Sequence, residues 1–295
     1  MIKLRCHTDH VEEAGIEPRV LAEFGLDHRA RVEPIRDRPD HRVCRVHDRH
    51  GTYVLKVWRG EDAPELANYR LLARLGVPTI QVVAATGSAL LLEDLGGTGA
   101  RRLATEDDLA DPAVITALAT WYRRLHDAGA PPGNWAVPWE HEHLTPDALR
   151  RTGRRLGLDH EPAWISAVES LDPVLEAARR LPQTLVHNDF HVTNLALVPG
   201  AAIMIDFELL RIGTRAGDLR NVTGQLGPAA RETFLASYGP VPTEEQVIDA
   251  PLAVLGALAQ FSGDAARLPR WVRFLVAEVR DGGLTRKLAA VAELH

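Results

Sequence analysis

The sequence predicts an α+β fold, with a small strand-rich N-terminal part and a larger, mainly helical C-terminal part. Short runs of β-branched and aliphatic residues occupy positions 52–58, 79–84 and 88–92. A glycine-rich segment, Gly96-Gly97, follows the last of these runs, and beyond it most apolar residues recur at helical spacing. We therefore expect the Gly-rich segment to link two parts of the molecule.

Composition excludes several classes of protein. The 295 residues are 45% hydrophobic and 25% charged, which suits one large or two moderate globular domains. The net charge of −6 argues against nucleic acid as a partner. There is no stretch apolar enough to span a bilayer, and two cysteines, Cys6 and Cys44, suit a reducing compartment. We expect a cytoplasmic protein, a monomer or weak dimer, without a nucleic-acid or membrane partner.

Lysine is rare in this chain, so a lysine within a predicted strand needs a reason. Of 34 basic residues only three are lysines, and one of them, Lys56, falls in the run 52–58 on the face opposite Leu55. A cation there is costly unless an anion meets it. Two interpretations are open: a lysine that reaches nucleotide phosphates, or a lysine whose charge reaches water from an edge strand.

A helix is predicted directly after this strand. Asp62 suits the N-cap, Pro64 the first turn and Glu65 the third position of a capping box, and Gly76-Val77-Pro78 ends the helix. Glu65 can also form an ion pair with Lys56. We favour the ion pair, because this is the nearest acidic helix after the strand.

The rest of the chain is mainly helical by its apolar spacing. We expect a helix at 114–126, a helical block at about 145–181, and three further helices at roughly 231–238, 244–261 and 271–294.

The most informative segment combines polar residues with three short strands. Runs at 184–186, 195–198 and 203–205 read as strands, and Pro199-Gly200 is the turn between the last two. Asp189 and Asn194 lie in the loop between the first two runs, and Asp206 follows the third. A Mg-phosphate site has this composition: one carboxylate orients a hydroxyl, and an amide and a carboxylate offer hard oxygen ligands.

Taken in order, these residues resemble the motifs of the aminoglycoside phosphotransferase and choline kinase family, which has a protein-kinase-like fold. The family has a Lys in its third strand, a Glu in the next helix, a His-x-Asp-x-x-x-x-Asn loop, and Ile-Asp-Phe or Ile-Asp-Trp followed by Glu. The matching positions are Lys56, Glu65, His187 to Asn194, and Ile205 to Glu208. Further matches, including Leu91 to Leu95 as the hinge and the downstream Gly213 and Asp218, extend the likeness over residues 40–220.

The resemblance implies a bilobal fold with a small antiparallel sheet in the N-terminal lobe and a larger, mainly helical C-terminal lobe. Residues 1–93 would form the nucleotide-binding lobe, 94–97 the hinge, and 98–295 the lobe with the catalytic loop and the acceptor site. ATP would bind with its adenine edge on backbone groups near Glu93 and Leu95. Lys56, held by Glu65, would contact the α- and β-phosphates.

It also implies an enzyme, an ATP-dependent O-phosphotransferase that acts on a small molecule. Asn194 and Asp206 would hold Mg²⁺, and Asp189 would orient the acceptor hydroxyl. The expected acceptor is an aminoglycoside-like or other cationic antibiotic, which would make the chain an antibiotic-resistance kinase. The alternatives are a small metabolite such as a choline-like amine, a sugar or homoserine, and a catalytically silent nucleotide-binding regulatory module.

Two features depart from the family pattern or limit it. The segment Arg36 to Arg42, where the nucleotide-covering loop should fall, has no glycine, and Asn188 stands where the family usually has Gly. The missing glycines favour the silent module, whereas the retained lysine, aspartates and asparagine oppose it. A kinase acting on protein is disfavoured, because Gly213 and Asp218 follow Asp206 too soon for a long activation segment.

The segment 134–143 contains two tryptophans and two histidines. Trp135 and Trp139 either anchor the loop or, with Glu140 and Glu142, present rings to a cationic or sugar-like acceptor, and we favour anchoring. His141 and His143 lack an evident third ligand, which argues against zinc.

Overall fold

The computed structural model describes residues 18–60, 64–96, 101–131 and 137–294. The chain divides into two compact units. The first unit ends at Tyr69 and resumes over Ile80–Thr98, and the second comprises Arg70–Thr79 and the chain from Gly99 onward. Among the described residues, no helix combines the length and the apolar composition needed to cross a membrane.

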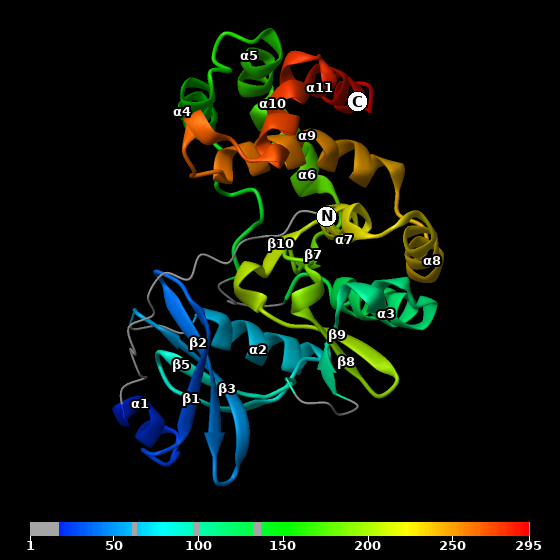
Figure 1. The fold of residues 1–295 in the computed structure, drawn as a ribbon. Coiled ribbons are helices and arrows are strands. Elements are labelled where there is room, and N and C mark those ends of the chain that lie inside the picture. Colours follow the sequence, from blue (N-terminus) through cyan, green and yellow to red (C-terminus); the bar gives the residue numbers. More distant parts are fainter. Residues whose placement is uncertain (1–17, 61–63, 97–100, 132–136, 295) are drawn as a thin grey trace. The chain divides into compact units, whose positions relative to one another are not determined.

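The first unit contains a five-stranded antiparallel sheet with the strand order β1-β2-β3-β5-β4 (Figure 1). Its strands are β1 (Arg31–Asp37), β2 (His41–Asp48), β3 (Gly51–Trp58), β4 (Val82–Ala85) and β5 (Ala89–Glu93). Helix α1 (Pro18–Glu23) belongs to the same unit, and helix α2 (Pro64–Leu75) begins in it.

The central strand β3 has two different faces, as the alternation of its residues predicts. Leu55 packs with Val46 of β2, Leu91 of β5 and Leu21 of α1 in a small apolar core. Lys56 lies on the other face and pairs in register with Val43 and Leu90. The interpretation of Lys56 as a residue of an edge strand is therefore wrong, because β3 has a hydrogen-bonded neighbour on each side.

The second unit is mainly helical. Its strands form two small sheets, β10-β7 and β6-β8-β9. The strands are β6 (Arg102–Leu103), β7 (Thr184–Val186), β8 (Leu195–Val198), β9 (Ala201–Met204) and β10 (Arg211–Gly213). The α-helices are α3 (Pro112–Asp127), α4 (Pro146–Leu156), α5 (Pro162–Glu169), α6 (Leu171–Arg180), α7 (Arg215–Gln225), α8 (Pro228–Tyr238), α9 (Thr243–Gln260), α10 (Arg270–Arg280) and α11 (Gly283–Ala292). Short 3₁₀ turns are η1 (Glu106–Ala110), η2 (Val192–Asn194), η3 (Phe207–Leu209) and η4 (Ala265–Arg267).

Helix α3 packs against strands of both small sheets. It begins with Pro112 after an N-cap, Asp111, whose carboxylate accepts a 2.8 Å hydrogen bond from the Ala113 N–H. Its buried face carries Trp121 and Tyr122, and the helix packs against β7, β9 and α8. These large rings fix the sheet edge from which the polar loop residues emerge.

A separate apolar core lies among helices α4, α5, α6, α9, α10 and α11, which gather at one end of the unit (Figure 1). Trp164 of α5 is fully buried in it, and its indole N–H donates to the Leu149 carbonyl at 3.2 Å. A Cβ on Gly153 would lie 2.5 Å from that indole nitrogen, so the glycine allows α4 and α5 to approach.

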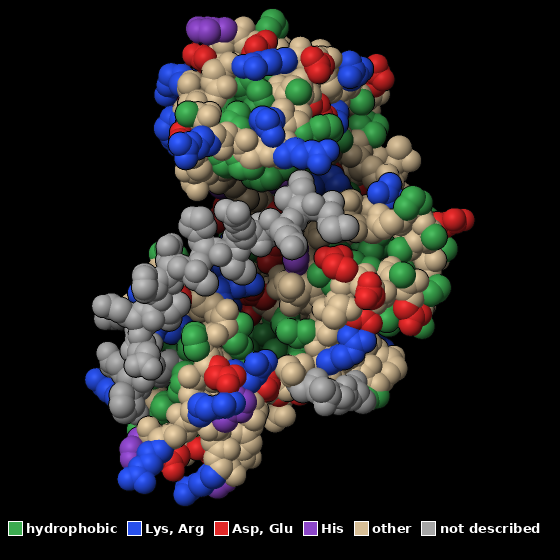
Figure 2. Space-filling model, viewed as in Figure 1, with side chains coloured by type: hydrophobic (Ala, Val, Ile, Leu, Met, Phe, Trp, Pro, Cys, Tyr) green, Lys and Arg blue, Asp and Glu red, His purple; other side chains and the backbone are tan. Residues whose placement is uncertain are grey.

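Arginines of the second unit lie on exposed helix faces beside acidic residues. Arg150 pairs with Asp147 within α4 at 2.8 Å, and Arg180 pairs with Glu176 within α6 at 3.2 Å. Figure 2 shows basic and acidic side chains interspersed on the visible face of the described residues. Such exposed pairs contribute little to stability, about 0–1 kcal/mol each.

The structure divides two of the expected helical segments. The block at 145–181 is three helices, with Gly157 in the left-handed conformation (φ +64°) directly after α4. The expected helix at 271–294 is broken between α10 and α11, where Gly282 has φ +73°. Strands β1, β2 and β10 and helix α7 carry too many charged residues or glycines for the apolar spacing to predict them.

Candidate active site

In the first unit, Lys56 and Glu65 form a buried ion pair. Lys56 Nζ donates to Glu65 Oε2 at 2.7 Å, and the two side chains are 6% and 1% exposed. The ammonium also lies 5.1 Å from the centre of the Trp58 ring. The expected ion pair is confirmed, while the capping partner proposed for Glu65, Asp62, lies outside the described residues. A charge this deeply buried persists only with an opposite charge beside it.

The exit of β5 is held by a second ion pair. Asp94 accepts from Arg45 Nε at 2.9 Å and from the Gly96 N–H at 2.8 Å. A Cβ on Gly96 would lie 1.9 Å from Arg45 Nη2, so a side chain at this position would displace the guanidinium from its present place. Leu95, between them, is buried at 4% exposure.

The backbone of Glu93 is partly committed within the sheet. Its N–H donates to the Gln81 carbonyl at 3.0 Å, and its carboxylate accepts from the Gln81 N–H at 2.8 Å. Leu95 lies two residues beyond the end of β5, so its amide is outside the β4–β5 pairing.

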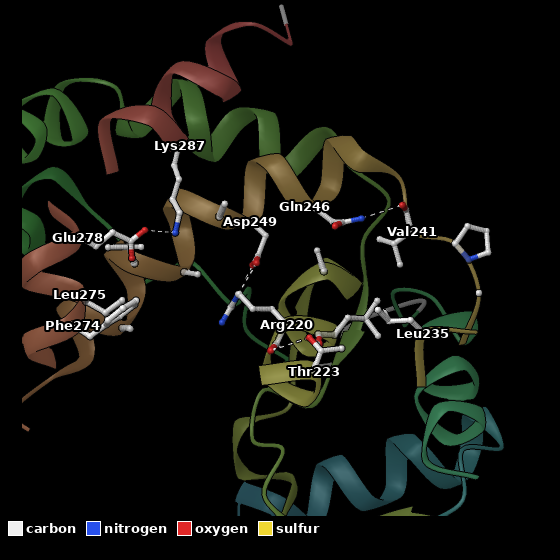
Figure 3. Close-up of a pocket in the computed structure, with 18 of the residues that line it drawn as sticks. Arg220, Thr223, Leu235, Val241, Gln246, Asp249, Phe274, Leu275, Glu278 and Lys287 are labelled. Carbon is white, nitrogen blue, oxygen red and sulfur yellow. Dashed lines mark hydrogen bonds and ion pairs between the residues drawn. The ribbon is translucent and has the colours of Figure 1, made fainter. Parts of the chain in front are cut away.

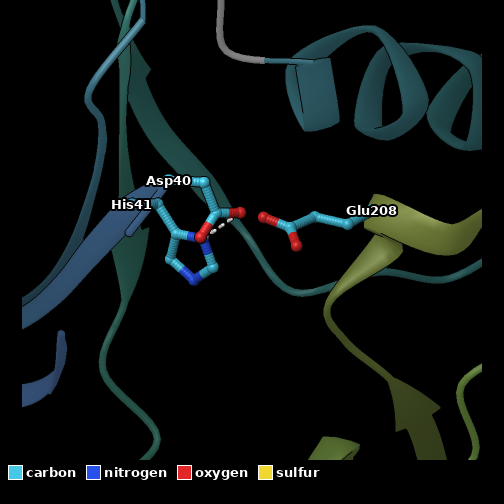
Figure 4. A group of neighbouring side chains, drawn as sticks. All are labelled: Asp40, His41 and Glu208. Atoms are coloured by element: carbon cyan, nitrogen blue, oxygen red, sulfur yellow. Dashed lines mark ion pairs between the residues drawn. The ribbon is translucent and has the colours of Figure 1, made fainter. Parts of the chain in front are cut away.

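The glycine-free turn between β1 and β2 is closed by side chains. The Arg38 N–H donates to the His41 carbonyl at 2.9 Å, and Asp37 accepts from Arg42 at 2.7 Å and from Arg59 at 2.5 Å. Asp40 Oδ2 lies 3.2 Å from His41 Nδ1 (Figure 4). The sequence thus replaces a flexible glycine loop with a turn fixed by ion pairs.

In the second unit, the segment His187–Asn194, here named the Asp189 loop, is anchored by a buried carboxylate. Asp218 of α7 is 0% exposed and accepts from the His187 N–H and the Asn188 N–H, each at 2.7 Å. Its Oδ2 also lies 3.1 Å from His126 Nε2 of α3. Burial alone would raise the pKa of Asp218, but its contacts with His126 and His187 and these hydrogen bonds hold the pKa below its usual range.

His187 is a neutral member of the loop scaffold. It is fully buried, its Nδ1 accepts from the Asp189 N–H at 3.2 Å, and its Nε2 donates to the Ile205 carbonyl at 3.1 Å. Burial lowers the pKa of His187, against the opposing effect of Asp218. These contacts make His187 a structural residue of the loop.

Two non-glycine residues of the site adopt the left-handed backbone conformation. Asn188 has φ +63° and Asp206 has φ +66°. Asn and Asp tolerate this region better than other side chains. The family pattern has Gly at position 188. Asn can replace it here because Asn tolerates this conformation and its backbone N–H still donates to Asp218.

The three polar residues singled out in the sequence emerge at one edge of the β8–β9 hairpin. Asn194 Nδ2 donates to Asp189 Oδ2 at 2.9 Å. The last hairpin pair is Leu195 with Met204, and the Ile205 N–H donates to the Asn194 carbonyl at 2.9 Å. Asp206, the next residue, therefore leaves the hairpin beside Asn194.

This set of donors fits a hard divalent cation. The side-chain nitrogen of Asn194 donates to Asp189, so the side-chain oxygen of Asn194 points away from that hydrogen bond. The Asp206 carboxylate is an oxygen ligand of the same kind, and Mg²⁺ prefers both.

Helix α7 has two distinct faces. Asp218, Val222 and Gln225 face the Asp189 loop or the core beneath it, and Gln225 donates to the Phe190 carbonyl. Arg220 and Thr223 lie on the opposite face and line a cavity of about 920 Å³ between α7, α8, α9 and α10 (Figure 3). The cavity is thus separated from the loop by the thickness of the helix.

Trp139 anchors its segment, as expected. Its indole N–H donates to Gln183 Oε1 at 3.2 Å, and the Arg179 guanidinium lies 4.2 Å from its ring centre. Trp135 lies outside the described residues. Glu140 has an 8% exposed side chain that accepts from the Thr214 N–H at the start of α7, so it is placed to support structure rather than to bind an acceptor.

The fold and the site together define a class. The chain has a kinase-like fold, with an N-terminal five-stranded antiparallel sheet followed by a mainly helical region. The sequence pattern of the Phosphotransferase enzyme family matches residues 31–248. The chain belongs to that family of small-molecule kinases, which confirms the resemblance drawn from the motifs.

Solved structures share the fold at low sequence identity. An amicoumacin kinase, hAmiN, in complex with AMP-PNP, Ca²⁺ and Ami is 18% identical with a TM-score of 0.62, covering 92% of this chain and 94% of that chain. APH(2")-IIa in a ternary complex with streptomycin and ATP is 16% identical with a TM-score of 0.60, covering 95% and 97%. A choline/ethanolamine kinase family protein from Mesorhizobium loti is 17% identical with a TM-score of 0.58, covering 88% and 92%. No curated protein matches the sequence.

Several residues that hold the site were not apparent in the sequence. Arg45, the partner of Asp94, and Glu140, at the start of α7, are examples. Each lies in a segment with many similar charged residues and acquires its role from a residue far along the chain. No local signal distinguishes them.

Proposed function

We propose that the chain transfers the γ-phosphate of ATP to a hydroxyl group of a small cationic molecule, with an aminoglycoside-like or other cationic antibiotic as the first candidate. The observation that carries this proposal is the 2.9 Å hydrogen bond from the Asn194 side chain to the Asp189 carboxylate, together with the backbone hydrogen bond that joins Asn194 to Ile205, the residue before Asp206. It supports the proposal because Asp189 can orient a hydroxyl, and Asn194 and Asp206 can offer oxygen ligands to a cation.

In this proposal the second unit performs the transfer. Asp189 accepts a hydrogen bond from the acceptor hydroxyl and aligns its oxygen with the γ-phosphate. Asn194 and Asp206 would hold Mg²⁺, which would offset negative charge on the phosphates. The Asp189 loop needs little rearrangement for this, because Asp218 and Ile205 already hold its backbone.

The first unit supplies the nucleotide contacts. Lys56, oriented by Glu65, contacts the α- and β-phosphates, and the backbone at Glu93 and Leu95 contacts the adenine edge. We propose residues 1–93 as the nucleotide-binding lobe, 94–97 as the hinge, and 98–295 as the lobe with the catalytic loop and the acceptor site. The two ion pairs at Lys56 and Asp94 would keep these contacts in place.

The choice of a cationic acceptor rests on charge and likeness. The net charge of −6 raises the local concentration of cations. Streptomycin and amicoumacin occupy two of the similar structures, whereas a third is a choline/ethanolamine kinase family protein. A choline-like amine or another small metabolite is therefore the second candidate.

A panel assay tests the proposal. Purified protein is incubated with Mg-ATP and with aminoglycosides, other cationic antibiotics, choline-like amines, sugars and homoserine, and products are detected by mass spectrometry. We expect an acceptor-dependent phosphorylated product. Binding of Mg-ATP without any product in the whole panel would favour a silent nucleotide-binding module instead.

Two variants test the assigned residues. Asp189→Ala and Asp206→Ala should each lower turnover by at least about 10³-fold, because each removes a group required in the transition state. Circular dichroism and thermal melting should show that both remain folded. Near-wild-type turnover in either variant would contradict the mechanism.

A further inference from the structure

A short segment before α4 runs alongside strand β10. The Ile212 N–H donates to the Pro138 carbonyl and the Glu140 N–H donates to the Ile212 carbonyl, both at 2.8 Å. Trp139 forms a parallel bridge with Ile212. The segment thus extends the β10-β7 sheet, and β7 leads directly into the Asp189 loop.

The Glu140 side chain points into the joint between β10 and α7. Its Oε1 accepts a 2.9 Å hydrogen bond from the Thr214 N–H, and Thr214 is the N-cap position of α7. A Cβ on Gly213 would lie 2.2 Å from the Glu140 carboxyl carbon. Gly213 is therefore glycine because the Glu140 carboxyl occupies the space that a side chain would need.

The joint between β10 and α7 contacts both elements that hold the Asp189 loop, strand β7 and residue Asp218. Gly213 pairs with Thr184 at the start of β7, whose end enters the loop. Asp218, one turn after Thr214, accepts the hydrogen bonds from His187 and Asn188. A shift of the joint would move the β7 end and the Asp218 carboxylate together.

We propose that Glu140 is a positioning residue for phosphoryl transfer, whose carboxyl group fixes the β10–α7 joint and thereby the Asp189 loop. The inference rests on the role proposed above for Asp189. Glu140 acts through Thr214, Gly213 and Asp218 and does not touch the reacting groups.

The surroundings of Glu140 keep its carboxyl group uncharged at neutral pH. The charged groups that face it are Asp218 and Arg220 of α7 and Asp249 of α9. Asp249 pairs with Arg220 at 2.7 Å (Figure 3). His141 Nε2 is 3.4 Å away in the same segment, but burial lowers the pKa of His141 to about 3, so this ring is neutral. Burial raises the pKa of Glu140 to about 8, the Thr214 N–H opposes this shift, and Asp249 and Asp218 add to it.

Ionisation of Glu140 would add a third carboxylate beside Asp218 and Asp249. A Cβ on Gly217 would lie 3.4 Å from Glu140 Oε2 and 3.5 Å from Asp249 Oδ1, which shows how closely these two oxygens approach the same point of α7. Repulsion there displaces the first turn of α7. Turnover should therefore fall as pH rises through about 8.

The test compares pH profiles of turnover for the full chain with the best acceptor. Wild type should lose about tenfold in kcat between pH 7 and pH 9, one pH unit above the Glu140 pKa. Glu140→Gln keeps an oxygen acceptor for Thr214 without a charge, so it should retain kcat at pH 7 within about threefold and lose the alkaline decline. Glu169→Gln, at an exposed position of α5, is the control and should behave as wild type.

Glu140→Ala should lower kcat by about 10- to 100-fold with the KM for ATP within about twofold, since the joint is displaced but the first unit is not. Gly213→Ala should have a similar effect, and the double variant should be no worse than either single variant, because each removes the same contact. An alkaline decline in Glu140→Gln equal to that of wild type, or a Glu140→Gln variant as slow as Glu140→Ala, would overturn the proposal.

Thermal melting separates this inference from the proposed function. Glu140 binds its proton more tightly in the folded chain, with a pKa of about 8 instead of the usual 4.5, so folding is progressively disfavoured as pH rises from about 4.5 to 8. The Tm of Glu140→Gln relative to wild type should increase over that window and level off above it. A pH-independent difference would overturn the neutral carboxyl even if no acceptor were found, whereas absence of transfer alone would contradict only the function.

Discussion

The two units fix their charged groups by different means. In the first unit Lys56 forms a direct ion pair with Glu65, and this pair is almost fully buried. In the second unit Asp189 is positioned indirectly, because Asp218 accepts hydrogen bonds from two backbone N–H groups of its loop. A direct ion pair fixes one atom, whereas a buried acceptor of several N–H groups fixes a length of backbone. The difference predicts that the two units will respond differently to loss of one residue.

The largest effect should come from Asp218→Ala. It leaves the His187 and Asn188 N–H groups without their acceptor and removes the contact with His126, which should destabilise the fold by roughly 3–5 kcal/mol. Turnover of the remaining folded protein should fall by at least about 10²-fold, because the loop is no longer fixed. Chemical denaturation and steady-state kinetics measure the two losses, with the exposed Asp107→Ala as the control. Full activity in a destabilised Asp218→Ala protein would show that the loop does not depend on this carboxylate.

The next effect separates the ion pair from its surroundings. Lys56→Met should cost about 3 kcal/mol, since it removes the ammonium that lies 2.7 Å from the buried Glu65 carboxylate. The double variant Lys56→Met with Glu65→Leu should recover most of that stability, because both charges are gone. Affinity for Mg-ATP should stay low in both, as measured by calorimetry. Additive losses of stability would mean that the pair is not the unit of stabilisation.

The smallest effect concerns the strained backbone of the loop. Asn188→Gly should change stability by no more than about 0.5 kcal/mol, because Asn already tolerates its φ of +63° and its N–H to Asp218 is kept. Asn188→Val, which adds a β-branched side chain in the left-handed region, should cost about 1–2 kcal/mol. Paired denaturation curves distinguish the two. Equal losses in both variants would show that the Asn side chain, not its backbone, supports the loop.

The parts that could be predicted from the sequence are those whose meaning is local. Lys56 stood out because lysine is rare and the residue lies opposite Leu55 in an alternating run, and its partner Glu65 was the nearest acidic helical residue. Asp189, Asn194 and Asp206 lie within one short stretch bounded by apolar strands, so their convergence followed from a single hairpin. Their roles in catalysis stay predictions.

The parts that escaped prediction depend on residues distant in the chain. Glu140 is one of two glutamates in a segment with two tryptophans and two histidines, and only its contacts with Thr214 and the Gly213 position distinguish it. Strand β2 mixes arginines and histidines with apolar residues without strict alternation, and its pairing with β3 becomes evident only in the folded sheet. The break after α10 depends on the left-handed conformation of Gly282, although the residues on both sides have helical spacing.

The close approach at Gly96 couples three residues at the end of β5. A side chain at position 96 would meet the end of the Arg45 guanidinium, so the arginine would have to move aside. Because the same arginine pairs with Asp94, this movement would weaken the contact that holds the end of β5. Sequence changes at positions 45 and 96 should therefore depend on one another.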